Sequence, residues 1–136
     1  MSPHTKVSES PPYKNVFIID DDPIHVFTTK RCLNNANFCE NIHVYQNGKE
    51  AFEAVNNIIK MNAVFPEIIL LDINMPIWDG WDFLNELEKL QFKKNINIYI
   101  TSSSKDPLDQ AKAKSYDLVK NFISKPFNID ELTTIQ

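Results

Sequence analysis

Three acidic residues and one lysine directly follow short apolar runs of the sequence, and together they could bind a cation and carry out nucleophilic chemistry. Asp20 and Asp21 follow residues 16–19, Asp72 follows residues 68–71, and Lys125 follows residues 121–124. Neighbouring carboxylates repel one another, and a hard cation such as Mg²⁺ relieves that repulsion because it prefers a few carboxylates, waters and phosphate oxygens as ligands. Solvated loop acids are the alternative interpretation of Asp20 and Asp21.

Asp72 has the setting of a nucleophile. Its alternative role is to cap the next helix, but that helix is expected to begin later, after Asp79 and Gly80, and Pro76 indicates an intervening loop. A carboxylate there can attack a phosphate if a metal ion and a cationic side chain offset the negative charge. Lys125 would supply that cation, although a lone lysine before a proline is more often a surface residue. The third acid of the first cluster, Asp22, is interpreted as a helix cap, with Pro23 at the first helical position.

These residues need a framework that brings strand ends together, and the pattern of the chain predicts one. Five short apolar runs alternate with amphipathic stretches, at residues 16–19, 42–45, 68–71, 96–100 and 121–124. Such alternation is typical of a parallel α/β sheet with helices on both faces, and this architecture places its chemistry at the carboxyl ends of the strands. Thr101 follows the fourth run and would join the same edge.

The helices are predicted with unequal clarity. Residues with helical spacing mark the second and third helices, namely Ala51, Val55, Ile58 and Ile59, and then Phe83, Leu84, Leu87 and Leu90. The fourth helix is predicted over residues 108–120, with Leu108, Ala111 and Val119 facing inward. A short fifth helix carries Ile129, Leu132 and Ile135. Residues 1–13 are expected to form a flexible leader, and residues 14–136 one domain.

Other common sites are poorly supported. The chain has only two glycines, Gly48 and Gly80, so neither a phosphate-binding Walker loop nor a dinucleotide fingerprint can be built. A Ser-His-Asp arrangement is also weak, because His25 is expected in a helix and His43 in a strand. Cys32 and Cys39 lack metal-ligand spacing and are expected to be free thiols.

The bulk properties favour protein partners. A formal net charge of -4 argues against nucleic-acid binding, which needs basic surface. The sequence has neither a signal-peptide pattern nor the ~20 apolar residues of a membrane span. A cytoplasmic location is therefore expected.

The pattern resembles the receiver domain of response regulators over nearly the whole chain. The matching segments are VFIIDDDP (16–23), ILLDINMPIWDG (69–80), IYITS (98–102) and FISKPF (122–127). The resemblance implies a flavodoxin-like, doubly wound fold with five parallel strands in the order 2-1-3-4-5 and five helices. It also implies a stand-alone signalling switch of a two-component phosphorelay rather than an enzyme.

The resemblance further implies a role for each chemical residue. Asp72 would accept the phosphoryl group and contact Mg²⁺, Asp21 would bind Mg²⁺ directly, and Asp20 would bind it through water. Asn74 would offer its backbone carbonyl to the metal. Lys125 would pair with the acceptor carboxylate and then with the phosphoryl group.

Two further residues would form the switch. Thr101 would hydrogen-bond a phosphoryl oxygen, and the side chain of Phe122 would follow that movement. Phe122 lacks the hydroxyl that a tyrosine would bring to this position. The peptide bond between Lys125 and Pro126 would be cis.

The implied partners are a histidine kinase or histidine phosphotransfer protein and a downstream target protein. The chain would be a monomer or a weak dimer that forms on phosphorylation. One alternative is a receiver-like interaction module that is never phosphorylated. Another is an aspartate-nucleophile phosphohydrolase, which would require a second acid two residues beyond Asp72, where this sequence has Asn74.

Overall fold

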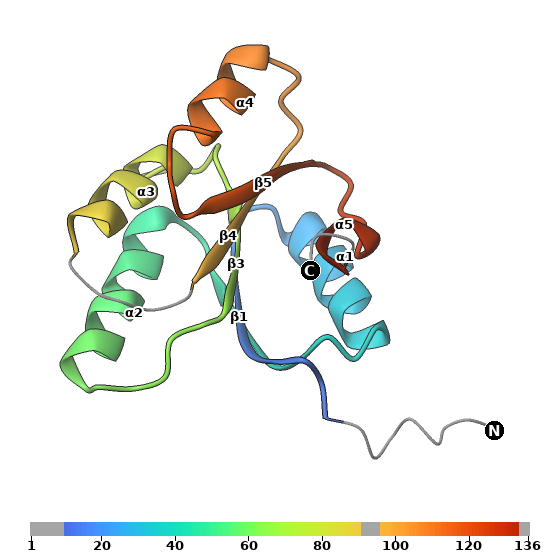
Figure 1. Ribbon diagram of the computed structural model, residues 1–136. Coiled ribbons are helices and arrows are strands. Elements are labelled where there is room, and N and C mark those ends of the chain that lie inside the picture. Colours follow the sequence, from blue (N-terminus) through green and yellow to red (C-terminus); the bar gives the residue numbers. More distant parts are fainter. Residues whose placement is uncertain (1–9, 91–95, 134–136) are drawn as a thin grey trace.

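The computed structural model describes residues 10–90 and 96–133 (Figure 1). Within these residues the protein forms one five-stranded parallel sheet in the order β2-β1-β3-β4-β5, which confirms the predicted flavodoxin-like topology. The strands are β1 (Tyr13–Ile19), β2 (Cys39–Tyr45), β3 (Ile68–Asp72), β4 (Asn97–Ser102) and β5 (Val119–Ser124). Tyr13, which the sequence assigned to the leader, is the first residue of β1.

The helices cover both faces of the sheet. They are α1 (Pro23–Asn35), α2 (Gly48–Lys60), α3 (Gly80–Lys89), α4 (Pro107–Ala113) and α5 (Asp130–Thr133). In Figure 1, α2 and α3 lie on one side of the sheet, and α1 and α5 lie on the other. The expected alternation of strands and helices is therefore confirmed.

Alternate side chains of each strand enter separate cores. In β1, Val16 and Ile18 pack with Leu33 of α1, while Phe17 and Ile19 pack with residues of α2 and α3. A strand buried on both faces must be apolar at every position, since successive side chains point to opposite faces. This requirement explains why residues 16–19 form an uninterrupted apolar run.

Side-chain caps fix where the helices begin. The carboxylate of Asp22 accepts hydrogen bonds from the backbone N–H groups of Ile24 and His25, and Pro23 occupies the first turn. The interpretation of Asp22 as a cap is thus confirmed. Asp79 and Asp82 form a reciprocal capping box at the start of α3, and α3 begins at Gly80 as expected.

The prediction for α4 was wrong at its carboxyl end. This helix stops at Ala113 instead of reaching residue 120, and Val119 begins β5. Leu108 is 75% exposed and Ala111 is also exposed, whereas Ala113 is buried.

Tyr116 explains the early end of α4. Its ring is buried and stacks on Trp81 of α3, with the ring centroids 6.0 Å apart. Its hydroxyl donates a hydrogen bond to Oδ1 of Asn85, 2.8 Å away. These contacts hold the chain against α3, and the Ser115 hydroxyl donates to the Lys112 carbonyl at the helix end.

Parts of two predictions lie outside the described residues: residues 1–9 of the leader, and Ile135 of the last helix. Across residues 10–90 and 96–133, no helix combines the length and apolar character that crossing a membrane requires.

We predict that Gly80→Ala destabilises the fold by about 1–3 kcal/mol because it overpacks the turn after β3. A Cβ at Gly80 would lie 2.6 Å from the Asp72 carbonyl oxygen and 2.8 Å from the Ile73 Cα, both of which are backbone atoms. Urea denaturation measures the effect. Gly48→Ala is the control. A Cβ at Gly48 would lie 3.0 Å from its nearest neighbouring atoms, so we expect a smaller loss of stability. An unchanged midpoint for Gly80→Ala would contradict this account of the turn.

Candidate functional site

The carboxyl ends of four strands bring the predicted residues to one edge of the sheet. Asp20 directly follows β1, Asp72 is the last residue of β3, and Lys125 directly follows β5. Thr101 lies in β4, in register with Asp72. Parallel strands end at a common edge, so residues far apart in the sequence meet there.

Three carboxylates form the centre of this edge. One oxygen from each of Asp20, Asp21 and Asp72 lies within 4.8 Å of the others. Asp20 and Asp72 are buried, while Asp21 is exposed. The Lys125 ammonium lies 3.2 Å from Oδ2 of Asp20 and 3.7 Å from Oδ2 of Asp72. The structure therefore brings together the acids and the lysine that the sequence singled out.

The other predicted residues surround this cluster. The backbone N–H of Asn74 donates to Oδ1 of Asp72 at 3.3 Å. Thr101 is buried between β3 and β5. The Lys125–Pro126 peptide bond is cis, and the Lys125 N–H donates to the Ser102 carbonyl at 2.9 Å.

Phe122 lies in β5, three residues before Lys125, and beside residues of α4. It is half-buried and lines a cavity of about 260 Å³ with Gln110, Ala113 and Lys114. Its side chain therefore borders this cavity and also packs against the core that contains Ala113 and Tyr116.

The two buried acids have opposite electrostatic environments. Burial raises the pKa of Asp20, but hydrogen bonds from His25 and the Asp22 backbone, together with the charge of Lys125, outweigh it and leave the pKa below its ordinary value. Burial and the neighbouring Asp20 carboxylate raise the pKa of Asp72 to about 6, against the opposing effect of Lys125. Asp20 is therefore the better stabilised anion of the pair.

The acid cluster suits a divalent cation. Its ligand atoms are all carboxylate oxygens, which hard cations prefer. Burial and then repulsion by the Asp20 carboxylate raise the pKa of Asp72. A bound cation would relieve this repulsion directly. Asp21, being exposed, leaves the cluster accessible from the surface.

Sequence reasoning missed His25. Its ring is 8% exposed, and Nδ1 lies 2.6 Å from Oδ2 of Asp20. His25 was predicted only as a helix residue. Its position three residues after the Asp22 cap was the available signal, because the first turn of a helix that follows a strand faces back toward the strand end.

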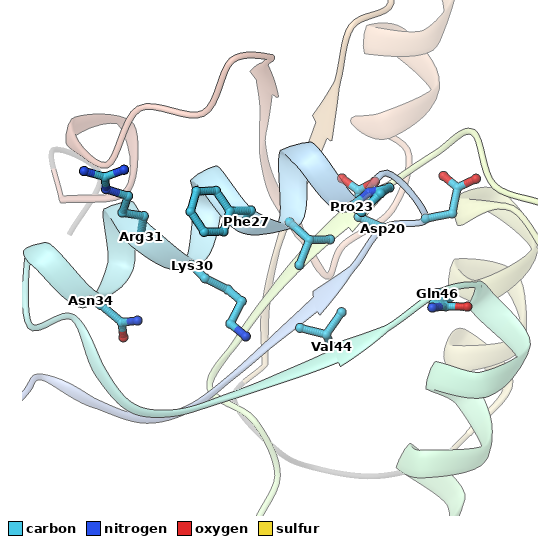
Figure 2. Close-up of a pocket in the computed structure, with 10 residues that line it drawn as sticks. Asp20, Pro23, Phe27, Lys30, Arg31, Asn34, Val44 and Gln46 are labelled. Carbon is cyan, nitrogen blue, oxygen red and sulfur yellow. The ribbon is translucent and has the colours of Figure 1, made fainter.

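A surface cavity adjoins the acids on the α1 side. Its volume is about 680 Å³, and Figure 2 shows its lining residues, which come from α1, β2 and the end of β1. Phe27 of α1 and Val44 of β2 are its exposed apolar members, and Lys30 and Arg31 supply positive charge. The edge of the sheet thus combines an acidic centre with an apolar and basic groove.

We predict that Asp72→Asn stabilises the metal-free protein near neutral pH. A folded-state pKa of about 6, against an ordinary 3.8, means that the folded state holds this proton more tightly than the unfolded state. Proton binding by Asp72 therefore favours the folded state, and this stabilisation is fully present below pH 3.8 and is lost as the pH rises through about 6. Asp20 has a lowered pKa and acts oppositely, contributing stability that is lost as the pH falls below its ordinary pKa.

We expect Asp72→Asn to increase the free energy of unfolding by about 1–3 kcal/mol at about pH 7.5, and this increase should shrink toward zero near pH 4. Urea denaturation in chelator-treated buffer measures it across this range. Asp117→Asn, which changes an exposed acid before β5, is the control and should show no such pH dependence. A gain that is equal at both ends of the range would contradict the raised pKa of Asp72.

Several known proteins are similar to this chain. It is 29% identical over 134 residues to the sensor histidine kinase CheAY of Helicobacter pylori, covering 98% of this chain and 16% of that protein. The chain spans only 16–54% of the length of the first three curated relatives. A two-component response regulator from Cytophaga hutchinsonii has a crystal structure with 32% identity and a TM-score of 0.80, covering 90% of this chain and 93% of that one.

A second solved structure shares the fold. The Mn²⁺-bound form of the response regulator Rcp1 is 22% identical, with a TM-score of 0.70 and coverage of 90% of this chain and 89% of that one. The family model of the response regulator receiver domain matches residues 16–135, a range that contains every site residue named above. The chain therefore belongs to the response regulator receiver domain family.

Proposed function

We propose that this chain is a phosphoacceptor switch of a two-component phosphorelay, in which Asp72 accepts a phosphoryl group from a phosphohistidine in the presence of Mg²⁺. The observation that carries the proposal is the position of Asp72, a buried carboxylate at the end of β3 beside two other carboxylates and the Lys125 ammonium. This role is that of a signalling module, which changes its own covalent state rather than converting a separate substrate.

Asp21, Asp72 and the backbone carbonyl of Asn74 would hold the metal, with Asp20 acting through water. When bound, Mg²⁺ supplies positive charge that offsets the carboxylates and the incoming phosphoryl oxygens. The fit of three carboxylate oxygens to a hard cation supports this assignment. The Mn²⁺ bound to Rcp1, a protein of the same fold, also supports a divalent ion here.

In the transfer, a carboxylate oxygen of Asp72 attacks the phosphorus atom. A bond forms between this oxygen and phosphorus while the phosphorus–nitrogen bond of the donor breaks, and the imidazole leaves with the electron pair. Lys125, 3.7 Å from Asp72, would move its charge toward the phosphoryl oxygens, and the Thr101 hydroxyl would donate to one of them. Positioning and charge neutralisation are the main requirements of phosphoryl transfer.

The phosphodonor would be a histidine kinase or a histidine phosphotransfer protein. The groove beside α1 supports docking of a protein, because it opens next to Asp20 and Asp21 and exposes Phe27 and Val44 (Figure 2). Exposed apolar side chains of this kind favour association with another protein surface.

The phosphoryl group would then change the surface formed by α4 and β5. It adds roughly -1.5 to -2 charges near neutral pH, to which Thr101 and Lys125 can respond. The cavity of about 260 Å³ beside Phe122 supports a change of its side-chain position, since the ring has space to enter. A downstream target that prefers one arrangement would sense the change.

We expect a single phosphoryl addition when the full chain is incubated with a small phosphodonor and Mg²⁺, as measured by intact mass. Asp72→Asn should abolish the addition, because it replaces the proposed nucleophile, and a chelator should prevent it in the wild type. Asp117→Asn is the matched control and should react as the wild type does. A folded wild type that gains no phosphoryl group would favour an interaction module that is never phosphorylated.

We also expect phosphorylation to alter backbone amide exchange over residues 107–124, which include α4 and β5, because Thr101 and Phe122 would couple the phosphoryl group to this surface. Hydrogen exchange read by mass spectrometry tests this. Residues 48–60 of α2 serve as the internal reference and should change less. Unchanged exchange over residues 107–124 in a fully phosphorylated sample would reject this region as the output surface.

A further inference from the structure

His25 contacts the acid cluster from the buried side of α1. Its Nδ1 atom lies 2.6 Å from Oδ2 of Asp20, and the two side chains are 8% and 2% exposed. Among the described residues, the three-acid group that could hold a cation contains Asp20 but not His25. His25 therefore contacts one acid of the candidate metal site without belonging to the acid cluster itself.

The Asp20 carboxylate is held at both oxygens. Oδ1 accepts a hydrogen bond from the Asp22 backbone N–H at 2.9 Å, and Oδ2 accepts one from His25 at 2.6 Å. The Lys125 ammonium forms an ion pair with Oδ2 at 3.2 Å. A carboxylate offers about four acceptor positions, so the two hydrogen bonds leave an acceptor position on Oδ1. The contacts thus fix the orientation of the group while leaving an acceptor position for a further donor or a cation.

Two side chains contact Oδ2 of Asp20, and of these only His25 contacts no other carboxylate of the cluster. Lys125 is shared with Asp72, 3.7 Å away, and under the proposed function its charge would also serve the phosphoryl group. The remaining ring nitrogen of His25, Nε2, is buried and has no hydrogen-bond partner within the described residues. The contact with Asp20 is therefore the one polar interaction that the His25 ring makes there.

Packing alone does not explain an imidazole at this position. His25, Thr29 and Leu33 form the buried stripe of α1, at a spacing of four residues. An apolar side chain at position 25 would fill the stripe without leaving a buried nitrogen unpaired, which is costly. The Asp22 cap and Pro23 start the helix directly after β1, so position 25 falls in the first turn, opposite Asp20.

We propose that His25 is a positioning residue of the metal site, whose Nδ1–H holds the Asp20 carboxylate in the orientation that serves the bound cation. The inference rests on the proposed function, because it assumes a divalent ion at the acid cluster. An ionised Asp20 carboxylate can only accept a hydrogen bond, so the proton in this contact is assigned to Nδ1 of His25. Under the proposed function Asp20 acts on the ion through water, and changes to such outer-shell partners of a metal site commonly alter metal affinity about 10–100-fold.

Calorimetric titration of the full chain with Mg²⁺, without phosphodonor, tests the proposal. His25→Asn keeps an amide N–H near the position of Nδ1, whereas His25→Gln moves it toward the position of Nε2, and His25→Leu removes it. We expect His25→Asn to bind Mg²⁺ within about 3-fold of the wild type, and His25→Gln and His25→Leu about 10-fold or more weakly. Thr29→Val, one turn along the same buried stripe, is the control and should leave the affinity unchanged.

Equal affinities for His25→Asn, His25→Gln and His25→Leu would overturn the proposal, and so would a loss in His25→Asn as large as that in His25→Leu. If His25→Leu fails to fold, the comparison of His25→Asn with His25→Gln decides between the outcomes. A wild type that is phosphorylated and binds Mg²⁺ no better than His25→Gln would reject this inference alone. A wild type that binds no Mg²⁺ would reject both the inference and the proposed metal-dependent function.

Discussion

Repulsion between two buried carboxylates, Asp20 and Asp72, is the constraint to which the rest of this site responds. The donors around them are divided unequally. Asp20 accepts hydrogen bonds from His25 and the Asp22 backbone and forms an ion pair with Lys125 at 3.2 Å. Within the described residues, Asp72 accepts a hydrogen bond only from the Asn74 N–H, at 3.3 Å, and lies 3.7 Å from Lys125. Asp20 therefore remains the stabilised anion, whereas burial, together with the Asp20 charge, raises the pKa of Asp72 to about 6. Environments that separate the pKa values of two neighbouring acids also separate their chemical roles. Under the proposed function, the less stabilised carboxylate is the one that would attack phosphorus.

The sheet maintains this unfavourable arrangement because its strands are buried on both faces. β1 and β3 are central neighbours, paired in register from Val16 with Ile68 to Ile19 with Leu71, so their ends cannot move apart without disrupting two cores. The turn after β3 is equally constrained, since Gly80 lies against the backbone of Asp72. Buried apolar packing thus holds the strand ends together against the electrostatic repulsion. A bound cation would reduce that repulsion.

The parts of the structure set by local pattern could be predicted from the sequence. Apolar runs identified the central strands, and Asp22 followed by Pro23 identified the start of α1, because burial on both faces and helix capping each leave a direct signature. The end of α4 could not be predicted, since it depends on Tyr116 meeting Trp81 and Asn85 of α3, and no glycine marks the turn. His25 was missed for a similar reason. Its partner is five residues away in sequence, but the pairing depends on how α1 packs against β1.

The proposed input and output surfaces lie on different sides of the sheet. The groove of about 680 Å³ is formed mainly by α1 and β2, whereas the cavity of about 260 Å³ beside Phe122 is formed by residues of α4 and β5 and of the segment between them. The acid cluster lies at the strand ends between them, so a donor docked on α1 need not cover α4. A covalent change shifts a conformational equilibrium only through contacts that differ between the two states. Thr101 and Lys125 are placed to supply such contacts under the proposed function. Thr101 lies in β4, paired with Ile123 of β5, and Lys125 directly follows β5, the strand that carries Phe122. Both residues lie at the same edge of the sheet as Asp72. This separation would allow the phosphorylated domain to release its donor and still present an altered surface to a target.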